Sequence, residues 1–234
     1  KKFNIPRIYC DEGENRVDGL GNEFAAKQIP YNNFYYSRAT DITKWTNNEY
    51  YVYLNKGVHK VTLVPVSGAF KIEYFAFGTF EMTNDYQKPQ DNSQNYKGEA
   101  IIIEGEDAVI KNSYWLAAKT DNSTLDVTPN SATKSLVNYI GGGNWKTCGE
   151  TIIWETPELE AGYYQLGFSY RQSSILGAKV YRSLKTDGVT PFKEASAIGF
   201  NYSYKWQNEF FADKENNPYL IYLSAGKHQI SMTV

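Results

Sequence analysis

One stretch of this chain occurs twice and decides the fold: YYVYLNKGVHKVTLVPV at residues 50–66 and LIYLSAGKHQISMTV at residues 220–234. In both copies an aromatic residue and a leucine precede a glycine, and a histidine follows the glycine at the second position. Apolar residues then alternate with polar ones, a period typical of a half-buried β-strand, and the glycine marks a turn. Each copy therefore predicts two strands joined by a turn.

Similar short runs continue along the chain, separated by Gly, Asn and Pro. We expect strands in the ranges 58–66, 69–81, 150–159, 163–172 and 178–188, and one turn of helix at 192–198. Aromatic residues make up 16% of the chain, and they suit pleated sheets. The pattern predicts an all-β protein with little helix, built as a sandwich of antiparallel sheets.

The repeat extends beyond the opening stretch and predicts the domain organisation. A second match pairs residues 3–12, FNIPRIYCDE, with residues 200–209, FNYSYKWQNE, at an offset of 197 residues. The opening stretches match at an offset of 169 residues. The difference of 28 residues indicates an insertion in the first copy, within about 13–41. We therefore expect residues 1–82 to be the C-terminal part of a first module, 83–98 a polar linker, and 99–234 a second module without its closing strand. Open sheet edges invite pairing, so we expect either that the sequence is an excised fragment or that strand complementation with a neighbouring module or chain covers the edge.

Charge and composition exclude several classes of function. The formal net charge is −2 and the pI is about 5.8, so nothing attracts nucleic acid, and no apolar run is long enough for membrane insertion. Cys10 and Cys148 lack zinc-site spacing and are expected as unpaired thiols, with a disulfide between them as the alternative. His59 and His228 occupy equivalent positions in the two repeats, which indicates hydrogen-bonded structural residues. No catalytic arrangement accompanies them, and we expect a non-catalytic chain.

Several motifs resemble the galactose-binding-like β-sandwich carbohydrate-binding modules. They are EGE at 104–106, WETPELEAGYY at 154–164, DGVTPFKEASAIGF at 187–200, LSAGKH at 223–228 and PRIYCDEGE at 6–14. The resemblance is to modules found in extracellular sugar-binding proteins of Gram-positive transporters and in gut-bacterial starch-adherence proteins. It implies tandem jelly-roll modules, an extracellular or cell-surface location, and an oligo- or polysaccharide ligand with starch-like α-glucan as the first expectation. For Glu104, Glu106 and Asp107 it implies a structural calcium ion, with a solvated acidic strand edge as the alternative, and no cofactor is required.

A sugar site needs flat rings for the C–H faces of the sugar, and amides or carboxylates for its hydroxyls. Trp145 follows three glycines and is expected to project from a loop, with a packed loop anchor as the alternative; Trp206 lies among other polar and aromatic candidates. The full set of candidate carbohydrate-binding residues is Trp145, Trp206, Tyr202, Tyr204, Asn208, Trp115, Tyr9, Tyr35, Tyr36 and Trp45. Trp154 is expected in the core. The rival interpretations are a structural spacer or protein-contact domain and, third, a glycoside-processing enzyme.

Overall fold

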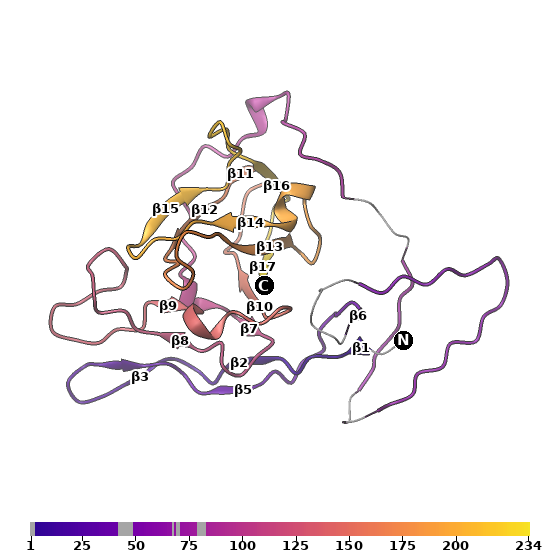
Figure 1. Ribbon diagram of the computed structural model, residues 1–234, viewed down its shortest axis with the longest axis horizontal. Coiled ribbons are helices and arrows are strands. Elements are labelled where there is room, and N and C mark those ends of the chain that lie inside the picture. Colours follow the sequence, from indigo (N-terminus) through magenta and orange to yellow (C-terminus); the bar gives the residue numbers. More distant parts are fainter. Residues whose placement is uncertain (1–2, 42–48, 67, 69–70, 79–82) are drawn as a thin grey trace.

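The computed structural model describes residues 3–41, 49–66, 68, 71–78 and 83–234, and its architecture is all-β (Figure 1). The predicted fold class is confirmed. Helical structure is limited to short 3-10 turns in the described residues: η1 (Asn92–Gln94), η2 (Gly105–Asp107), η3 (Gly142–Asn144) and η4 (Lys193–Ser196). The last of these lies at the helical turn that the sequence predicts for 192–198.

A seven-stranded antiparallel sheet organises the molecule. Its spatial order is β14 (Ile198–Phe200), β13 (Val180–Thr186), β17 (Gln229–Thr233), β10 (Thr151–Glu155), β7 (Ile110–Lys111), β2 (Tyr9–Asp11) and β5 (Gln28–Pro30). The second repeat supplies β17, which pairs with β10 on one side and β13 on the other. The strands predicted at 150–159 and 178–188 are therefore confirmed as β10 and β13.

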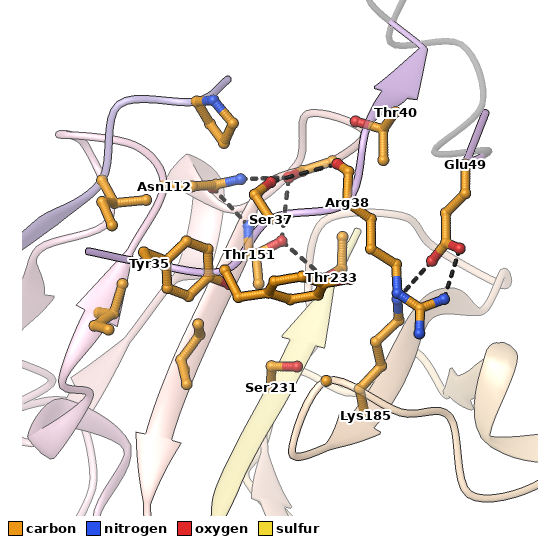
Figure 2. Close-up of a pocket in the computed structure, with 17 residues that line it drawn as sticks. Tyr35, Ser37, Arg38, Thr40, Glu49, Asn112, Thr151, Lys185, Ser231 and Thr233 are labelled. Atoms are coloured by element: carbon orange, nitrogen blue, oxygen red, sulfur yellow. Dashed lines mark hydrogen bonds and ion pairs between the residues drawn. The ribbon is translucent and has the colours of Figure 1, made fainter. Parts of the chain in front are cut away.

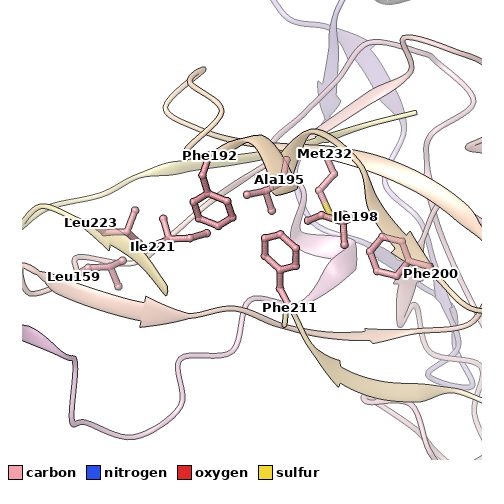
Figure 3. Packing of buried hydrophobic residues seen from close by; sticks show 10 residues of the cluster. Leu159, Phe192, Ala195, Ile198, Phe200, Phe211, Ile221, Leu223 and Met232 are labelled. Atoms are coloured by element: carbon pink, nitrogen blue, oxygen red, sulfur yellow. The ribbon is translucent and has the colours of Figure 1, made fainter. Parts of the chain in front are cut away.

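Two shorter strand pairs face this sheet and enclose the core. They are β11 (Gly162–Gln165) with β16 (Leu220–Leu223) and β12 (Gly167–Tyr170) with β15 (Gln207–Phe210). Leu184 and Met232 from the large sheet meet Ile221 and Leu223 from β16 in one buried cluster, which Figure 3 shows together with Phe192, Ala195, Ile198, Phe200, Phe211 and Leu159. Burial of these side chains is the main source of stability.

Three further strand pairs lie outside the two main layers. They are β1 (Phe3–Asn4) with β6 (Thr40–Asp41), β3 (Arg16–Val17) with β4 (Glu23–Phe24), and β8 (Ala118–Lys119) with β9 (Tyr139–Ile140).

Strands from the first repeat extend the large sheet. Strand β2 pairs with β7 at Tyr9 and Lys111, and with β5 along its length. The Lys111 side chain is completely buried, and its ammonium donates to Asp11 Oδ2 at 2.7 Å, so an ion pair ties β2 to the sheet. Among the described residues of 1–82, strands form only two-stranded pairs and this sheet edge. The boundaries at 82 and 99 remain a prediction.

The predicted linker packs against the sandwich. The Tyr86 ring makes edge contacts with Phe192 and Tyr219, and its hydroxyl accepts a hydrogen bond from the Leu220 amide at 3.1 Å. The Tyr96 ring stacks on Tyr164 with centroids 4.7 Å apart. These contacts hold the chain between the first repeat and β7 along the facing layer.

Three strand predictions need correction. The predicted strand at 163–172 is divided at Leu166 into β11 and β12, which belong to different strand pairs. The strands predicted at 58–66 and 69–81 are absent: no strand is assigned in the described residues 50–66 and 71–78, while 67, 69–70 and 79–81 lie outside the described residues. A strand requires a hydrogen-bonded neighbour and a buried face, and the described side chains from 51 to 66 are exposed.

The remaining structural expectations concern the cysteines and the membrane. Cys10 and Cys148 are both free thiols, as expected. In the part of the chain that the structure describes, no helix is long and apolar enough to cross a membrane.

Candidate carbohydrate-binding site

A pocket lined by both polar and apolar side chains lies on the outer face of the large sheet, where the segment 35–40 crosses β7, β10 and β17 (Figure 2). We call it the sheet pocket; its volume is about 160 Å³. Tyr35 and Tyr36 form part of its wall, while Thr151, Ser231 and Thr233 project from the strands beneath. The pocket therefore combines aromatic rings with hydroxyl groups.

Strand alternation explains why these groups share one face. Successive side chains of a strand point to opposite faces, so Ser231 and Thr233 face outward while Met232 enters the core. The same rule places Lys185 at the pocket and its neighbour Leu184 in the core. Alternation therefore places polar side chains on the outer face, where Ile110 and Ile153 also line the pocket.

Hydrogen bonds fix the floor of the sheet pocket. The Asn112 side chain accepts from the Thr151 amide at 2.7 Å and donates to the Gly149 carbonyl at 2.7 Å. The Thr151 and Thr233 hydroxyls are hydrogen-bonded to each other at 2.8 Å. These bonds hold the floor in one arrangement, which lowers the entropic cost of ordering it around a ligand.

Three charged residues line one side of the pocket. The Glu49 carboxylate accepts from Arg38 Nη1 at 2.7 Å and from Lys185 Nζ at 3.2 Å. Burial of Glu49 raises its pKa, but the hydrogen bonds and charges of the two cations outweigh that effect and hold the pKa below its ordinary value. Two cations and one carboxylate leave this side with a net positive charge at neutral pH.

The tyrosine wall remains uncharged and accessible. Burial raises the pKa of Tyr35, so its phenol is protonated at neutral pH. Tyr36 is 60% exposed. At about 160 Å³ the pocket is smaller than the roughly 300–1,000 Å³ sites that enclose drug-sized ligands. Its size suits one small polar unit, such as a single sugar ring.

An aromatic patch, in which Tyr9 is half-buried and Tyr114 and Trp115 are exposed, forms a second surface. The Tyr114 ring lies edge-on to Tyr9, with centroids 5.7 Å apart, and to Trp115, with centroids 5.5 Å apart. The Arg7 guanidinium lies 5.8 Å from the Tyr9 centroid, and the Asn144 side chain donates to the Trp115 carbonyl at 2.9 Å. Trp115 is 69% exposed, so its indole is available to a ligand.

Trp206 belongs to a different cluster at the loop ends. Its indole N–H donates to Asp121 Oδ2 at 2.8 Å, Arg171 lies 5.5 Å above the ring, and Tyr139 meets it edge-on at 6.0 Å. Burial of Asp121 raises its pKa, but hydrogen bonds from Ser123 and Trp206 and the charge of Arg171 outweigh that and lower it. The polar edge of Trp206 is therefore already engaged within the protein.

Trp145 is not the projecting side chain that its glycines suggest, and this expectation is wrong. Its ring is half-buried, meets Trp154 edge-on at 6.4 Å and carries the Arg182 guanidinium 4.6 Å above it. Its indole N–H donates to the Glu150 carbonyl at 3.0 Å. Trp145 is the loop anchor considered as the alternative. Trp154 packs against the core as expected, and its indole N–H donates to the Gly105 carbonyl.

The remaining candidate carbohydrate-binding residues do not lie together in one site. Tyr202 is half-buried, whereas Tyr204 and Asn208 are exposed, and Asn208 lies on β15 opposite Ser169. Trp45 lies outside the described residues. The structure therefore brings the candidates into three separate places: Tyr35 and Tyr36 at the sheet pocket, Tyr9 and Trp115 in the aromatic patch, and Trp206 at the loop ends.

The carboxylates expected to hold calcium lie on and beside η2. Burial is the main cause that raises the pKa of Glu106 to about 7, and the neighbouring charges of Glu104, Asp107 and Glu23 add to it. Glu106 Oε2 is buried without a hydrogen-bond partner. Within the described ranges, however, no three His, Cys, Asp or Glu side chains are grouped so that they could hold a metal ion. The carboxylates do not fit a calcium site as they stand. The ion stays a prediction, checked by whether calcium raises the thermal unfolding temperature.

His228 is structural, as expected. Its ring is buried, Nδ1 lies 2.6 Å from Asp187 Oδ2 and Nε2 lies 3.0 Å from the Ser224 carbonyl oxygen. The hydrogen bond with Asp187 is the main cause that raises the pKa of His228.

Sequence reasoning missed most of the sheet pocket. The missed polar and charged residues are Ser37, Arg38, Thr40, Glu49, Asn112, Thr151, Lys185, Ser231 and Thr233, and the other missed residues include Ile8, Ile110 and Ile153. A signal was present in the polar positions that alternate with apolar ones along β10, β13 and β17. Those positions form a pocket only where the segment 35–40 crosses the sheet, and the sequence does not show where that crossing lies.

Comparison with known proteins gives only distant structural likenesses. No family model and no curated protein matches the chain. A crystal structure of a Paenibacillus sp. cycloisomaltooligosaccharide glucanotransferase complexed with cycloisomaltoheptaose is similar over 60% of this chain, with 20% identity and a TM-score of 0.39. A Podospora anserina GH26-CBM35 β-(1,4)-mannanase is similar over 56%, with 14% identity and a TM-score of 0.36. The matches span 17% and 23% of those chains. Both structural neighbours are carbohydrate-active enzymes, but likenesses this weak carry no argument about what this chain binds.

Proposed function

We propose that the protein binds carbohydrate without cleaving it, and that the sheet pocket receives one sugar ring. The observation that carries the proposal is the lining of that pocket: two tyrosines in the wall, and hydroxyl groups on a hydrogen-bonded floor. Rings can pack on the C–H face of a sugar, while hydroxyl, guanidinium and ammonium groups bond its hydroxyls.

The aromatic patch supports binding of a longer chain. Trp115 is highly exposed and is flanked by Tyr114, so it offers a flat apolar surface outside the pocket. Each surface alone would bind weakly, and two surfaces engaged by one polysaccharide would bind more tightly than either because the second contact is intramolecular. We propose an extracellular or cell-surface location and a starch-like α-glucan as the first ligand to test.

The test is affinity electrophoresis in gels that contain different polysaccharides. We expect one of them to retard the protein, and Tyr35→Ala and Tyr36→Ala to restore its mobility. Tyr181→Ala is the matched control, because Tyr181 is an exposed tyrosine that is not among the pocket's lining residues. Retardation that survives both pocket substitutions, or no retardation by any polysaccharide, would reject the pocket as a sugar site. Accumulation of reducing sugar would reject a non-catalytic role.

A structural role is the second candidate. It is favoured by the apolar side chains exposed between residues 51 and 66, which suit contact with another protein surface.

A further inference from the structure

The turn of the first repeat has the same local geometry as the folded turn of the second. We call residues 51–66 the first arch and residues 220–233 the second arch. Gly57 and Gly226, at equivalent positions, have φ angles of 149° and 122°. His59 Nε2 lies 2.6 Å from the carbonyl oxygen four residues earlier, and His228 Nε2 makes the same contact at 3.0 Å. The first arch is therefore preformed at its turn.

The second arch joins the two layers of the sandwich. Its first arm, β16, pairs with β11, and its second arm, β17, lies between β10 and β13. Because the arms belong to different sheets, they do not pair with each other, and each needs strands from elsewhere. The inward side chains Ile221, Leu223 and Met232 are only 5%, 8% and 7% exposed.

The first arch carries the same inward apolar positions without the sandwich. The offset of 169 residues places Val52, Leu54 and Leu63 opposite Ile221, Leu223 and Met232. These three side chains are 66%, 43% and 36% exposed, and no strand is assigned in the described residues 50–66. In Figure 1 this purple segment runs out and away from the sandwich. The equivalent apolar side chains are therefore buried in the second arch and exposed in the first arch.

The exposed apolar surface is large enough for a stable interface. The large apolar side chains exposed on and just after the first arch are Tyr51, Val52, Tyr53, Leu54, Val58, Val61, Leu63, Val64, Val66, Ile72, Tyr74, Phe75 and Phe77. At on the order of 100 Å² each, they present more than about 1,000 Å² of apolar surface. Stable protein interfaces bury about 1,200–2,000 Å² over both partners.

We propose that the first arch is a donor that completes a second β-sandwich. The partner is a polypeptide with the strand set of residues 99–219, β15 included, whose arch position is vacant. The second arch pairs Met232 with Ile152 on one side and Leu184 on the other, so Leu63 takes that place in the partner. This chain's own sandwich is not the acceptor, because residues 220–233 already fill it.

The experiment supplies the acceptor in one polypeptide. Residues 99–219 are fused by a flexible Gly/Ser linker ahead of the complete chain, and hydrogen exchange is measured in the fusion and in the chain alone. We expect amides within 52–64 to gain protection of at least ~100-fold in the fusion, because strand amides in a core open rarely. The second arch stays protected in both proteins.

Two substitutions make the result specific. Leu63→Asp abolishes the gained protection, because the aspartate would be buried in the acceptor. Val58→Lys preserves it, because the equivalent residue, Lys227, is exposed and pairs with Glu155 on the surface. If residues 52–64 exchange equally fast in the fusion and in the chain alone, or if Leu63→Asp retains the protection, the donor role is overturned.

Discussion

Replacement of Asp11 by alanine tests how the first repeat is attached to the large sheet. The Lys111 side chain is completely buried, its ammonium lies 2.7 Å from Asp11 Oδ2, and Asp11 is 26% exposed. Removing one partner of a buried ion pair costs roughly 3–5 kcal/mol because the other charge is left without compensation. Since water reaches Asp11 in part, we expect about 3 kcal/mol for Asp11→Ala.

The assay is urea denaturation of the wild-type protein and three variants. Glu12→Ala is the matched control one residue along: its ion pair with Lys27 spans 3.5 Å between exposed side chains, so we expect no measurable loss. The double variant Asp11→Ala, Lys111→Met removes both charges and should recover most of the stability, because an apolar side chain can replace the buried ammonium. The reasoning is refuted if Asp11→Ala costs no more than Glu12→Ala.

Three further predictions concern pH and packing. The folded state holds the Glu106 proton up to about pH 7, whereas the unfolded state releases it near the ordinary 4.5. Stability should therefore fall by about 1–2 kcal/mol as the pH rises between these values, after a discount for partial exposure; Glu106→Gln should flatten the profile, and Asp107→Asn should flatten it only in part, because the Asp107 charge is a smaller cause of the shift than burial. His228 has a raised pKa, so its contribution is present below pH about 6.5 and is lost as pH rises through the folded value; Asp187→Asn should remove this dependence in the same urea series. Leu184→Ala in the core should cost about 2–5 kcal/mol by calorimetry, and Leu176→Ala, at an exposed position, almost nothing; equal costs would contradict the assigned core.

Local patterns predicted the strands whose partners lie within the second repeat. Strands β10 and β13 follow from apolar alternation, because both have neighbours on the large sheet and one face in the core. The same alternation at 58–66 gave a wrong strand, because alternation reports a capacity for pairing and cannot report whether a partner is there. The open sheet edge suggested that a neighbouring module could supply a strand, but the sequence did not identify β2 as that strand, because Tyr9 and Lys111 lie about 100 positions apart.

Site prediction was limited in the same way. Three glycines before Trp145 suggested a projecting ring, but Arg182 and Trp154 come from other strands and enclose it. Tyr35 and Tyr36 were found from their place in the insertion, whereas the polar floor beneath them was not. Aromatic residues are visible in a sequence, but the tertiary contacts that cover or expose them are not.

Carbohydrate binding itself is tested most directly by probing a glycan array with the complete chain, alongside the Tyr36→Ala variant. We expect the wild-type chain to bind a small set of related glycans, starch-like α-glucans first among them, and the variant to lose that set. An array on which the wild-type chain binds no glycan, or on which the variant binds the same glycans equally well, would contradict the account.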